Sequence, residues 1–167
     1  SAYKIIEICH RSGLGKILLV IIPRNRRNAE KIKEVKKMAA YYKINVIEQP
    51  YSEGLNEFEE ILIKYNIDMG ISWSYSQIIQ PSTIKIFKKG IWNMHGGKIP
   101  EYRGASVLQW AIVNGETELG VTWHLINQEV DAGDILLDDV VPISEEETAL
   151  DARAKIFEKG IEMFQLL

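Results

Sequence analysis

Residues 91–104 read Ile91-Trp-Asn-Met-His-Gly-Gly-Lys-Ile-Pro-Glu-Tyr-Arg-Gly104, and the rest of the sequence is best understood from this segment. Its first residues have strand character, and alternate side chains of a strand share a face, so Asn93 and His95 should project together. Two glycines and Pro100 then predict a wide loop. A histidine at a strand end is more often a hydrogen-bonded structural residue than a catalyst. The neighbouring sequence must therefore decide its role.

Strands and helices are expected to alternate on both sides of this segment. Apolar, β-branched runs indicate strands, and apolar residues at helical spacing indicate helices. This alternation predicts an α/β fold, with a doubly wound, mostly parallel Rossmann-like sheet and helices on both faces. We expect strands at 17–22, 45–48, 69–73, 121–126 and 135–143, and helices at 3–10, 29–42, 56–65 and 105–113, with a closing helix after Ser144.

Local signals refine these boundaries. Asn56 with Glu59, and Ser144 with Glu147, have the spacing of capping boxes that open helices. The run from 17 to 22 is continuously apolar, which is typical of a strand buried on both faces. The acidic, glycine-containing segment 127–134 joins two strands and is also compatible with a simple hairpin. We assign packing roles to Trp110 and His124.

Composition limits the classes of protein. A chain of 167 residues predicts a single domain, 1–167, and its net charge of −3 gives no electrostatic case for nonspecific nucleic-acid binding. The single cysteine, Cys9, excludes an intramolecular disulfide and a multi-cysteine metal site, and it favours a reducing compartment. The longest apolar run, Ile17–Pro23, is too short to cross a bilayer. We therefore expect a cytoplasmic protein with no bound metal and no membrane partner.

Two loops are expected at the carboxyl ends of strands, where ligands bind in open α/β sheets. The first follows residue 22 and carries Arg24, Arg26 and Arg27. These arginines would suit an anionic group of a substrate, although such a run is more often only solvated. The second is the polar, aromatic loop that begins at Ser74, which should share a sheet edge with His95.

Three ordered motifs carry a resemblance. Asn93-Met-His95, Pro100-x-Tyr-Arg-Gly104 and Val130-Asp-Ala-Gly-Asp-Ile135 together resemble the folate-dependent formyltransferase family. This family includes glycinamide ribonucleotide transformylase, methionyl-tRNA formyltransferase and the sugar-amine N-formyltransferases. The resemblance implies an acceptor amine that attacks the formyl carbon of 10-formyltetrahydrofolate. It also implies that Asn93, His95 and Asp131 are the catalytic residues.

The resemblance further implies where the donor and the acceptor bind. The pterin of the folate is expected between the loop that follows the strand 69–73 and the loop that carries Asp131. The residues expected to bind the folate are Ser74, Tyr75, Ser76, Gln77, Ile78, Ile79, Gln128, Glu129 and Val130. The residues expected to bind the acceptor are Arg103, Gly104 and Arg24.

Two departures from the family pattern bear on the function. The family opens with a strand and a glycine-containing turn, whereas this sequence opens at what resembles the next helix, so we expect the first strand to be missing. Residues 96–98 are Gly-Gly-Lys where relatives that formylate methionyl-tRNA have a Ser-Leu-Leu-like segment. The expected acceptor is therefore a small amine, such as an amino sugar on a nucleotide. Methionyl-tRNA formylation, hydrolysis of formyltetrahydrofolate and an inactive folate-binding fragment remain the alternatives, and the sequence leaves the oligomeric state open.

Overall fold

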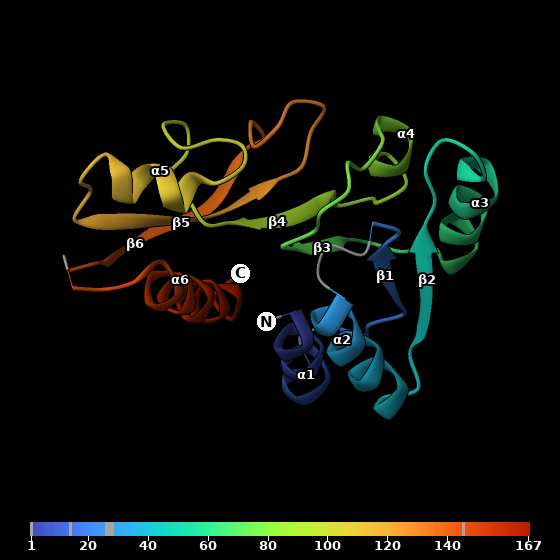
Figure 1. Cartoon of the computed structure of the whole chain (residues 1–167). Coiled ribbons are helices and arrows are strands. Elements are labelled where there is room, and N and C mark those ends of the chain that lie inside the picture. The colour runs from blue at the N-terminus through green and yellow to red at the C-terminus, as the bar shows by residue number, and fades with distance from the viewer. Residues whose placement is uncertain (1, 14, 26–28, 145) are drawn as a thin grey trace. The chain divides into compact units, whose positions relative to one another are not determined.

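A computed structural model describes residues 2–13, 15–25, 29–144 and 146–167 (Figure 1). The chain divides into two compact units, Ser1–Lys89 and Gly90–Leu167, which are considered separately below. The predicted α/β class is confirmed, because helices and strands alternate along both units. The expectations of a single domain and of a missing first strand stay predictions. Within the described part of the chain, no helix is long and apolar enough to span a membrane.

The N-terminal unit is built on a parallel pair of strands. β1 and β2 run in parallel, with Leu19 opposite Asn45 and Pro23 opposite Gln49. Residues from α1, β1 and α2 form its core, which includes Ile6, Val20, Ile22 and Ala39. Figure 1 shows α3 beyond β2, away from α1 and α2. The elements of this unit are α1 (Ala2–Ser12), β1 (Leu19–Pro23), α2 (Ala29–Tyr41), β2 (Asn45–Gln49), α3 (Leu55–Tyr65), β3 (Gly70–Trp73) and α4 (Pro81–Ile84).

Two expectations for this unit are wrong. Burial alternates along β1, because Val20 and Ile22 are buried in the cluster with Ile6 and Ala39 while their neighbours are only partly covered. The capping box at Asn56 does not form, because α3 follows Gly54, whose φ of 83° lies in the left-handed region. Glu59 instead accepts hydrogen bonds from the hydroxyl groups of Ser82 and Thr83, at 2.7 and 2.6 Å.

The C-terminal unit contains β4 (Ile91–His95), α5 (Val107–Val113), β5 (Glu118–Leu125), β6 (Ile135–Pro142) and α6 (Ala149–Phe164). The β4–β5 and β5–β6 ladders are antiparallel, whereas β1 and β2 of the other unit are parallel. Segment 127–134 reverses the chain directly, so β5 and β6 form a hairpin. A register shift interrupts the β5–β6 ladder between Trp123 and His124.

α6 packs on β5 and fixes the core of this unit (Figure 1). Trp123 is fully buried, its indole N–H donates to the carbonyl of Gly160 at 2.9 Å, and its ring centroid lies 5.4 Å from that of Phe164. Alternation along β5 therefore commits Trp123 to the helix-covered face, while the next residue, His124, points to the other face.

The start of α6 differs from the expected capping box at Ser144. The helix begins at Ala149, and Thr148 with Asp151 forms the capping box. The backbone N–H of Ser144 does donate to the carboxylate of Glu147, at 2.8 Å, but this contact precedes the helix. The spacing of the motif recurs four residues later, where the helix actually starts.

Candidate active site

β4 and β5 bring the predicted polar residues into register. In their antiparallel ladder, Asn93 lies opposite His124 and His95 lies opposite Thr122. His95 is 8% exposed, and the hydroxyl of Thr122 donates to the carbonyl of Gly97 at 2.9 Å. The strands, rather than flexible loops, therefore hold these side chains.

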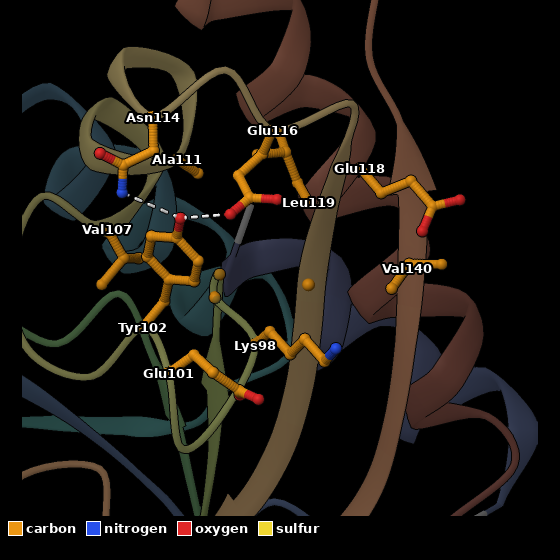
Figure 2. A pocket seen from close by; sticks show the side chains of 13 residues that line it. Lys98, Glu101, Tyr102, Val107, Ala111, Asn114, Glu116, Glu118, Leu119 and Val140 are labelled. Carbon is orange, nitrogen blue, oxygen red and sulfur yellow. Dashed lines mark hydrogen bonds between the residues drawn. The ribbon is translucent and has the colours of Figure 1, made fainter.

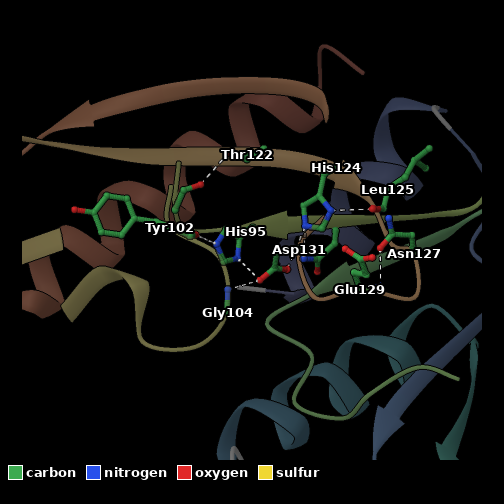
Figure 3. A network of polar contacts seen from close by, with 11 residues as sticks. His95, Tyr102, Gly104, Thr122, His124, Leu125, Asn127, Glu129 and Asp131 are labelled. Atoms are coloured by element: carbon green, nitrogen blue, oxygen red, sulfur yellow. Dashed lines mark hydrogen bonds and ion pairs between the residues drawn. The ribbon is translucent and has the colours of Figure 1, made fainter. Parts of the chain in front are cut away.

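Asp131 joins the two imidazoles, as Figure 3 shows. Its Oδ2 atom lies 3.4 Å from Nδ1 of His95, and its Oδ1 atom lies 3.4 Å from Nε2 of His124. Oδ2 also accepts a hydrogen bond from the backbone N–H of Gly104, at 2.9 Å. The structure thus brings the three predicted catalytic residues into one cluster, because His124 also lies 3.1 Å from the side-chain nitrogen of Asn93.

The partners of His95 define where its protons lie. Nε2 lies 2.7 Å from the carbonyl oxygen of Tyr102, which can only accept, so Nε2 donates. Nδ1 faces the carboxylate of Asp131, which is also an acceptor when ionised. A ring that carries a proton on each nitrogen satisfies both contacts, and this arrangement suits a group that passes a proton or stabilises negative charge.

The environment favours the ionised form of Asp131. Burial raises the pKa of its carboxyl group. The contacts with His124, with the charge of His95 and with the backbone N–H of Gly104 outweigh burial, so the pKa lies below its usual value. Asp131 can therefore hold a proton-bearing imidazole in one orientation at neutral pH.

The backbone of loop 127–134 positions this carboxylate. Asp131 has a φ of 48°, in the left-handed region, which aspartate tolerates better than most residues. A Cβ atom at Gly133 would overlap the carbonyl oxygen of Leu125, so only glycine allows the loop to lie this close to β5. The N–H of Leu125 donates to the carbonyl of Asp134 at 2.9 Å and closes the loop.

His124 belongs to the polar cluster, although its position in an apolar strand predicts a packing role. The ring is 1% exposed, and its Nδ1 atom donates to the carbonyl of Leu125 at 2.8 Å. The available signal was the alternation of β5 combined with antiparallel pairing to β4, which places His124 opposite Asn93. The packing role assigned to Trp110 is wrong, because this side chain is 60% exposed on α5.

A cavity of about 370 Å³ in the same unit is lined in part by residues 96–98, 101 and 102 (Figure 2). Asn114 donates to the hydroxyl of Tyr102 at 3.1 Å, and that hydroxyl donates to Glu116 at 2.6 Å. The hydrogen bond to Glu116 raises the pKa of Tyr102. None of Asn93, His95 and Asp131 lines this cavity, so it is distinct from the polar cluster.

The predicted folate loop in the N-terminal unit is fixed by its own polar side chains. Gln77 accepts from the backbone N–H of Arg24 at 3.0 Å and donates to the carbonyl of Pro50 at 2.7 Å. Ser76 donates to the side chain of Asn25 at 2.5 Å. These contacts tie the loop to the segments that follow β1 and β2.

Tyr75 and Gln49 complete this anchoring. The hydroxyl of Tyr75 donates to Gln49 at 2.9 Å, and Gln49 donates to the carbonyl of Ile78 at 2.8 Å. Burial raises the pKa of Tyr75, so its hydroxyl is a neutral donor. Ile78 itself is 68% exposed. The loop therefore presents the aliphatic side chain of Ile78, while Tyr75, Ser76 and Gln77 are engaged in hydrogen bonds.

The predicted acceptor-binding residues have different surroundings. Arg24 is exposed, with its guanidinium 5.8 Å from the ring centroid of Tyr51 in the N-terminal unit. Arg103 is exposed, and Gly104 holds Asp131 through its N–H. Arg26 and Arg27 lie outside the described residues. The roles of Arg24, Arg103 and Gly104 in acceptor binding stay predictions, as do those of the expected folate-binding residues.

The described residues contain no group of three or more His, Cys, Asp or Glu side chains arranged to hold a metal ion. The polar cluster instead combines an amide, two imidazoles and a carboxylate. Such a combination offers hydrogen-bond donors and acceptors together with groups that can exchange protons.

The comparisons with known proteins give the family. The profile described as Formyl transferase matches residues 2–166, and the chain belongs to this family. The resemblance of the three motifs is thereby confirmed. The chain is similar to a methionyl-tRNA formyltransferase of Synechococcus sp. (strain JA-3-3Ab), with 41% identity over 96 residues, 58% of this chain and 30% of that protein. It spans less than half the length of the curated relatives it matches.

Solved structures share the fold. Glycinamide ribonucleotide transformylase 1 from Symbiobacterium toebii superposes with a TM-score of 0.83 at 22% identity, covering 98% of this chain and 77% of that chain. WlaRD, a sugar 3N-formyl transferase solved in the presence of dTDP and 5-N-formyl-THF, gives a TM-score of 0.73 at 24% identity, covering 98% and 56%. At these identities the likeness establishes the fold.

Proposed function

We propose that this chain transfers a formyl group from 10-formyltetrahydrofolate to the primary amine of a small acceptor, such as an amino sugar linked to a nucleotide. The observation that carries the proposal is the cluster of Asn93, His95 and Asp131, in which an ionised carboxylate contacts an imidazole beside an amide. Membership of the formyl transferase family supports it.

The cluster suits the bond changes of formyl transfer. The acceptor nitrogen attacks the formyl carbon, and the carbonyl electron pair moves onto oxygen. The bond between that carbon and the folate nitrogen then breaks, the acceptor nitrogen loses a proton, and the folate nitrogen gains one. An N–H of Asn93 and a proton-bearing His95 stabilise the negative oxygen, and the imidazole passes the proton. Asp131 contacts that imidazole and keeps it in one orientation.

The loops expected to bind the folate fit a flat heterocycle with hydrogen-bonding edges. Such a ring needs apolar walls and backbone donors and acceptors. Ile78 in the N-terminal unit is 68% exposed, and Val130 in the C-terminal unit is 60% exposed. Each loop thus offers an aliphatic side chain beside backbone groups, and the donor would supply the formyl group that the cluster transfers.

The small acceptor is favoured by the net charge of −3 and by Gly96-Gly-Lys98. The structural likeness to WlaRD, a sugar 3N-formyl transferase solved with a nucleotide and a formyl-folate, supports the same acceptor class. Methionyl-tRNA is the second candidate, because the 41% identical relative is a methionyl-tRNA formyltransferase.

The test is a formyl-transfer assay with 10-formyltetrahydrofolate and separate acceptors: a nucleotide-linked amino sugar, glycinamide ribonucleotide and methionyl-tRNA. We expect the amino sugar to be formylated, with release of tetrahydrofolate that depends on the amine. His95→Ala should lower this rate at least about 100-fold while the fold is kept. Release of formate without an amine would instead identify a hydrolase, and binding of folate without turnover would identify an inactive folate-binding domain.

A further inference from the structure

We propose that His124 is a positioning residue, which pairs with the side-chain amide of Asn93 and so fixes the direction of the N–H that meets the formyl oxygen. This inference rests on the proposed function and extends it to a buried residue outside the three predicted catalytic positions.

The proton on His124 can be located from its partners. Nδ1 lies 2.8 Å from the carbonyl oxygen of Leu125. A carbonyl oxygen only accepts, so Nδ1 carries the hydrogen. Nε2 lies 3.1 Å from the side-chain nitrogen of Asn93. The ring and the amide of Asn93 are therefore hydrogen-bonding partners.

This contact fixes the orientation of an otherwise ambiguous group. The oxygen and nitrogen of an asparagine amide have nearly the same shape, and only the hydrogen-bond network distinguishes them. With the amide of Asn93 held by His124, the direction of its N–H groups is set. A preorganised donor of this kind is what a developing oxyanion requires.

The surrounding structure makes His124 rigid enough for this role. The ring is 1% exposed, and the β4–β5 ladder places His124 directly opposite Asn93. On its other side, Nε2 lies 3.4 Å from Oδ1 of Asp131. These contacts hold the ring, and with it the amide of Asn93, in one orientation.

The first experiment is a double-mutant cycle on turnover. We expect His124→Ala to lower kcat for formyl transfer at least about 10-fold with little change in KM, because the oxyanion exists only after attack begins. In an Asn93→Ala background the same change should have no further effect, since the orientation of the amide no longer matters. An equal loss in both backgrounds would overturn the inference, because it would indicate a general structural role.

The conservative variant His124→Gln places an amide group near the position of Nε2. We expect it to recover part of the turnover lost in His124→Ala, because it restores a hydrogen-bonding partner for Asn93. Turnover of His124→Gln equal to that of His124→Ala, with both variants folded, would contradict the positioning role.

The second experiment does not depend on activity. In the 15N-labelled protein, the side-chain amide signals of Asn93 are assigned by their loss in Asn93→Ala. We expect both signals to move toward the positions of a solvent-exposed amide in His124→Gln and, where it folds, in His124→Ala, with the larger movement in the alanine variant. The matched control is Val121→Ala, which removes a buried apolar side chain from the same strand and should leave the Asn93 signals in place.

Unchanged Asn93 signals in both His124 variants would overturn the inference even if formyl transfer is confirmed. Conversely, moved signals in a protein that transfers no formyl group would leave the contact established and remove the proposed function. The two failures are therefore distinguishable.

Discussion

Gly97 packs directly against the imidazole of His95. A Cβ atom at residue 97 would lie 2.8 Å from Nε2 of His95, 2.7 Å from the carbonyl oxygen of Tyr102 and 3.0 Å from Val107. The first two of these separations are shorter than real Cβ contacts, and one partner is backbone. A side chain at this position must therefore displace either the ring of His95 or the loop that accepts its hydrogen bond.

Gly97→Ala is expected to lower formyl transfer at least about 10-fold and to reduce the free energy of unfolding by roughly 1–3 kcal/mol, the usual cost of overpacking. Steady-state kinetics and urea unfolding measure the two effects. Gly15→Ala is the matched control, because a Cβ there meets nothing within 4 Å. Parent-like activity in Gly97→Ala would show that the ring of His95 tolerates displacement.

The lowered pKa of Asp131 makes stability depend on pH. A carboxyl group whose folded-state pKa is depressed stabilises the protein above its unfolded pKa, about 3.9, and loses this contribution as the pH falls through the folded value. Asp131→Asn should therefore unfold more easily than the parent at pH 7, and the difference should shrink in acid. Urea unfolding from pH 7 to pH 3 measures it, with the exposed Asp134→Asn as the charge-removal control. A difference that does not change with pH would contradict the assignment.

Asn93→Ala should reduce turnover while leaving the Michaelis constant for the acceptor nearly unchanged. The physical reason is that an N–H aimed at the oxyanion acts on a charge that the bound substrate does not yet carry. Initial-rate kinetics over a range of acceptor concentrations separate the two parameters. A change confined to the Michaelis constant would assign Asn93 to ground-state binding instead.

Trp123→Phe should lower the free energy of unfolding by about 1–3 kcal/mol, because the carbonyl of Gly160 loses its buried donor. Trp110→Phe is the matched control. It changes the same residue type at a side chain that is 60% exposed, so its effect should stay within about 0.5 kcal/mol. Equal effects at the two tryptophans would mean that α6 does not hold β5 through this contact.

Replacement of Arg24, Arg26 and Arg27 by Gln should weaken binding of a nucleotide-linked acceptor, because guanidinium groups pair with phosphate oxygens. The affinity for a non-reactive folate analogue should not change. Paired calorimetric titrations with the two ligands provide the measurement. Equal acceptor affinity in the variant and the parent would remove the phosphate role, and loss of both affinities would indicate a damaged fold.

The secondary structure was predictable where a single pattern dominates a segment. The helix 29–42 and the strand 45–48 match α2 and β2 within a residue or so at each end. Capping boxes were less reliable, because Ser, Thr, Asn, Asp and Glu recur at the required spacing by chance. In α6 the capping box is formed by Thr148 and Asp151 and not by Ser144 and Glu147. Both pairs have the required spacing, so the sequence alone does not distinguish them.

Only those residues of the polar cluster that belong to the sequence motifs could be predicted. Asn93, His95 and Asp131 carry motifs, whereas His124 acquires its place from strand pairing between segments that are distant in sequence. The sequence pattern around a buried histidine in an apolar strand is the same whether its ring packs against a core residue or hydrogen-bonds to an amide. Pairing partners had to be known before the two cases could be separated.

All four polar side chains of the cluster lie between residues 93 and 131, inside the unit Gly90–Leu167. The loop that carries Arg24, Arg26 and Arg27 and the loop Ser74–Ile79 are encoded upstream, within Ser1–Lys89. A recombination crossover near codon 90 would therefore transmit the entire cluster intact while replacing both of these loops. In evolutionary terms, the cluster and these two loops can be inherited separately.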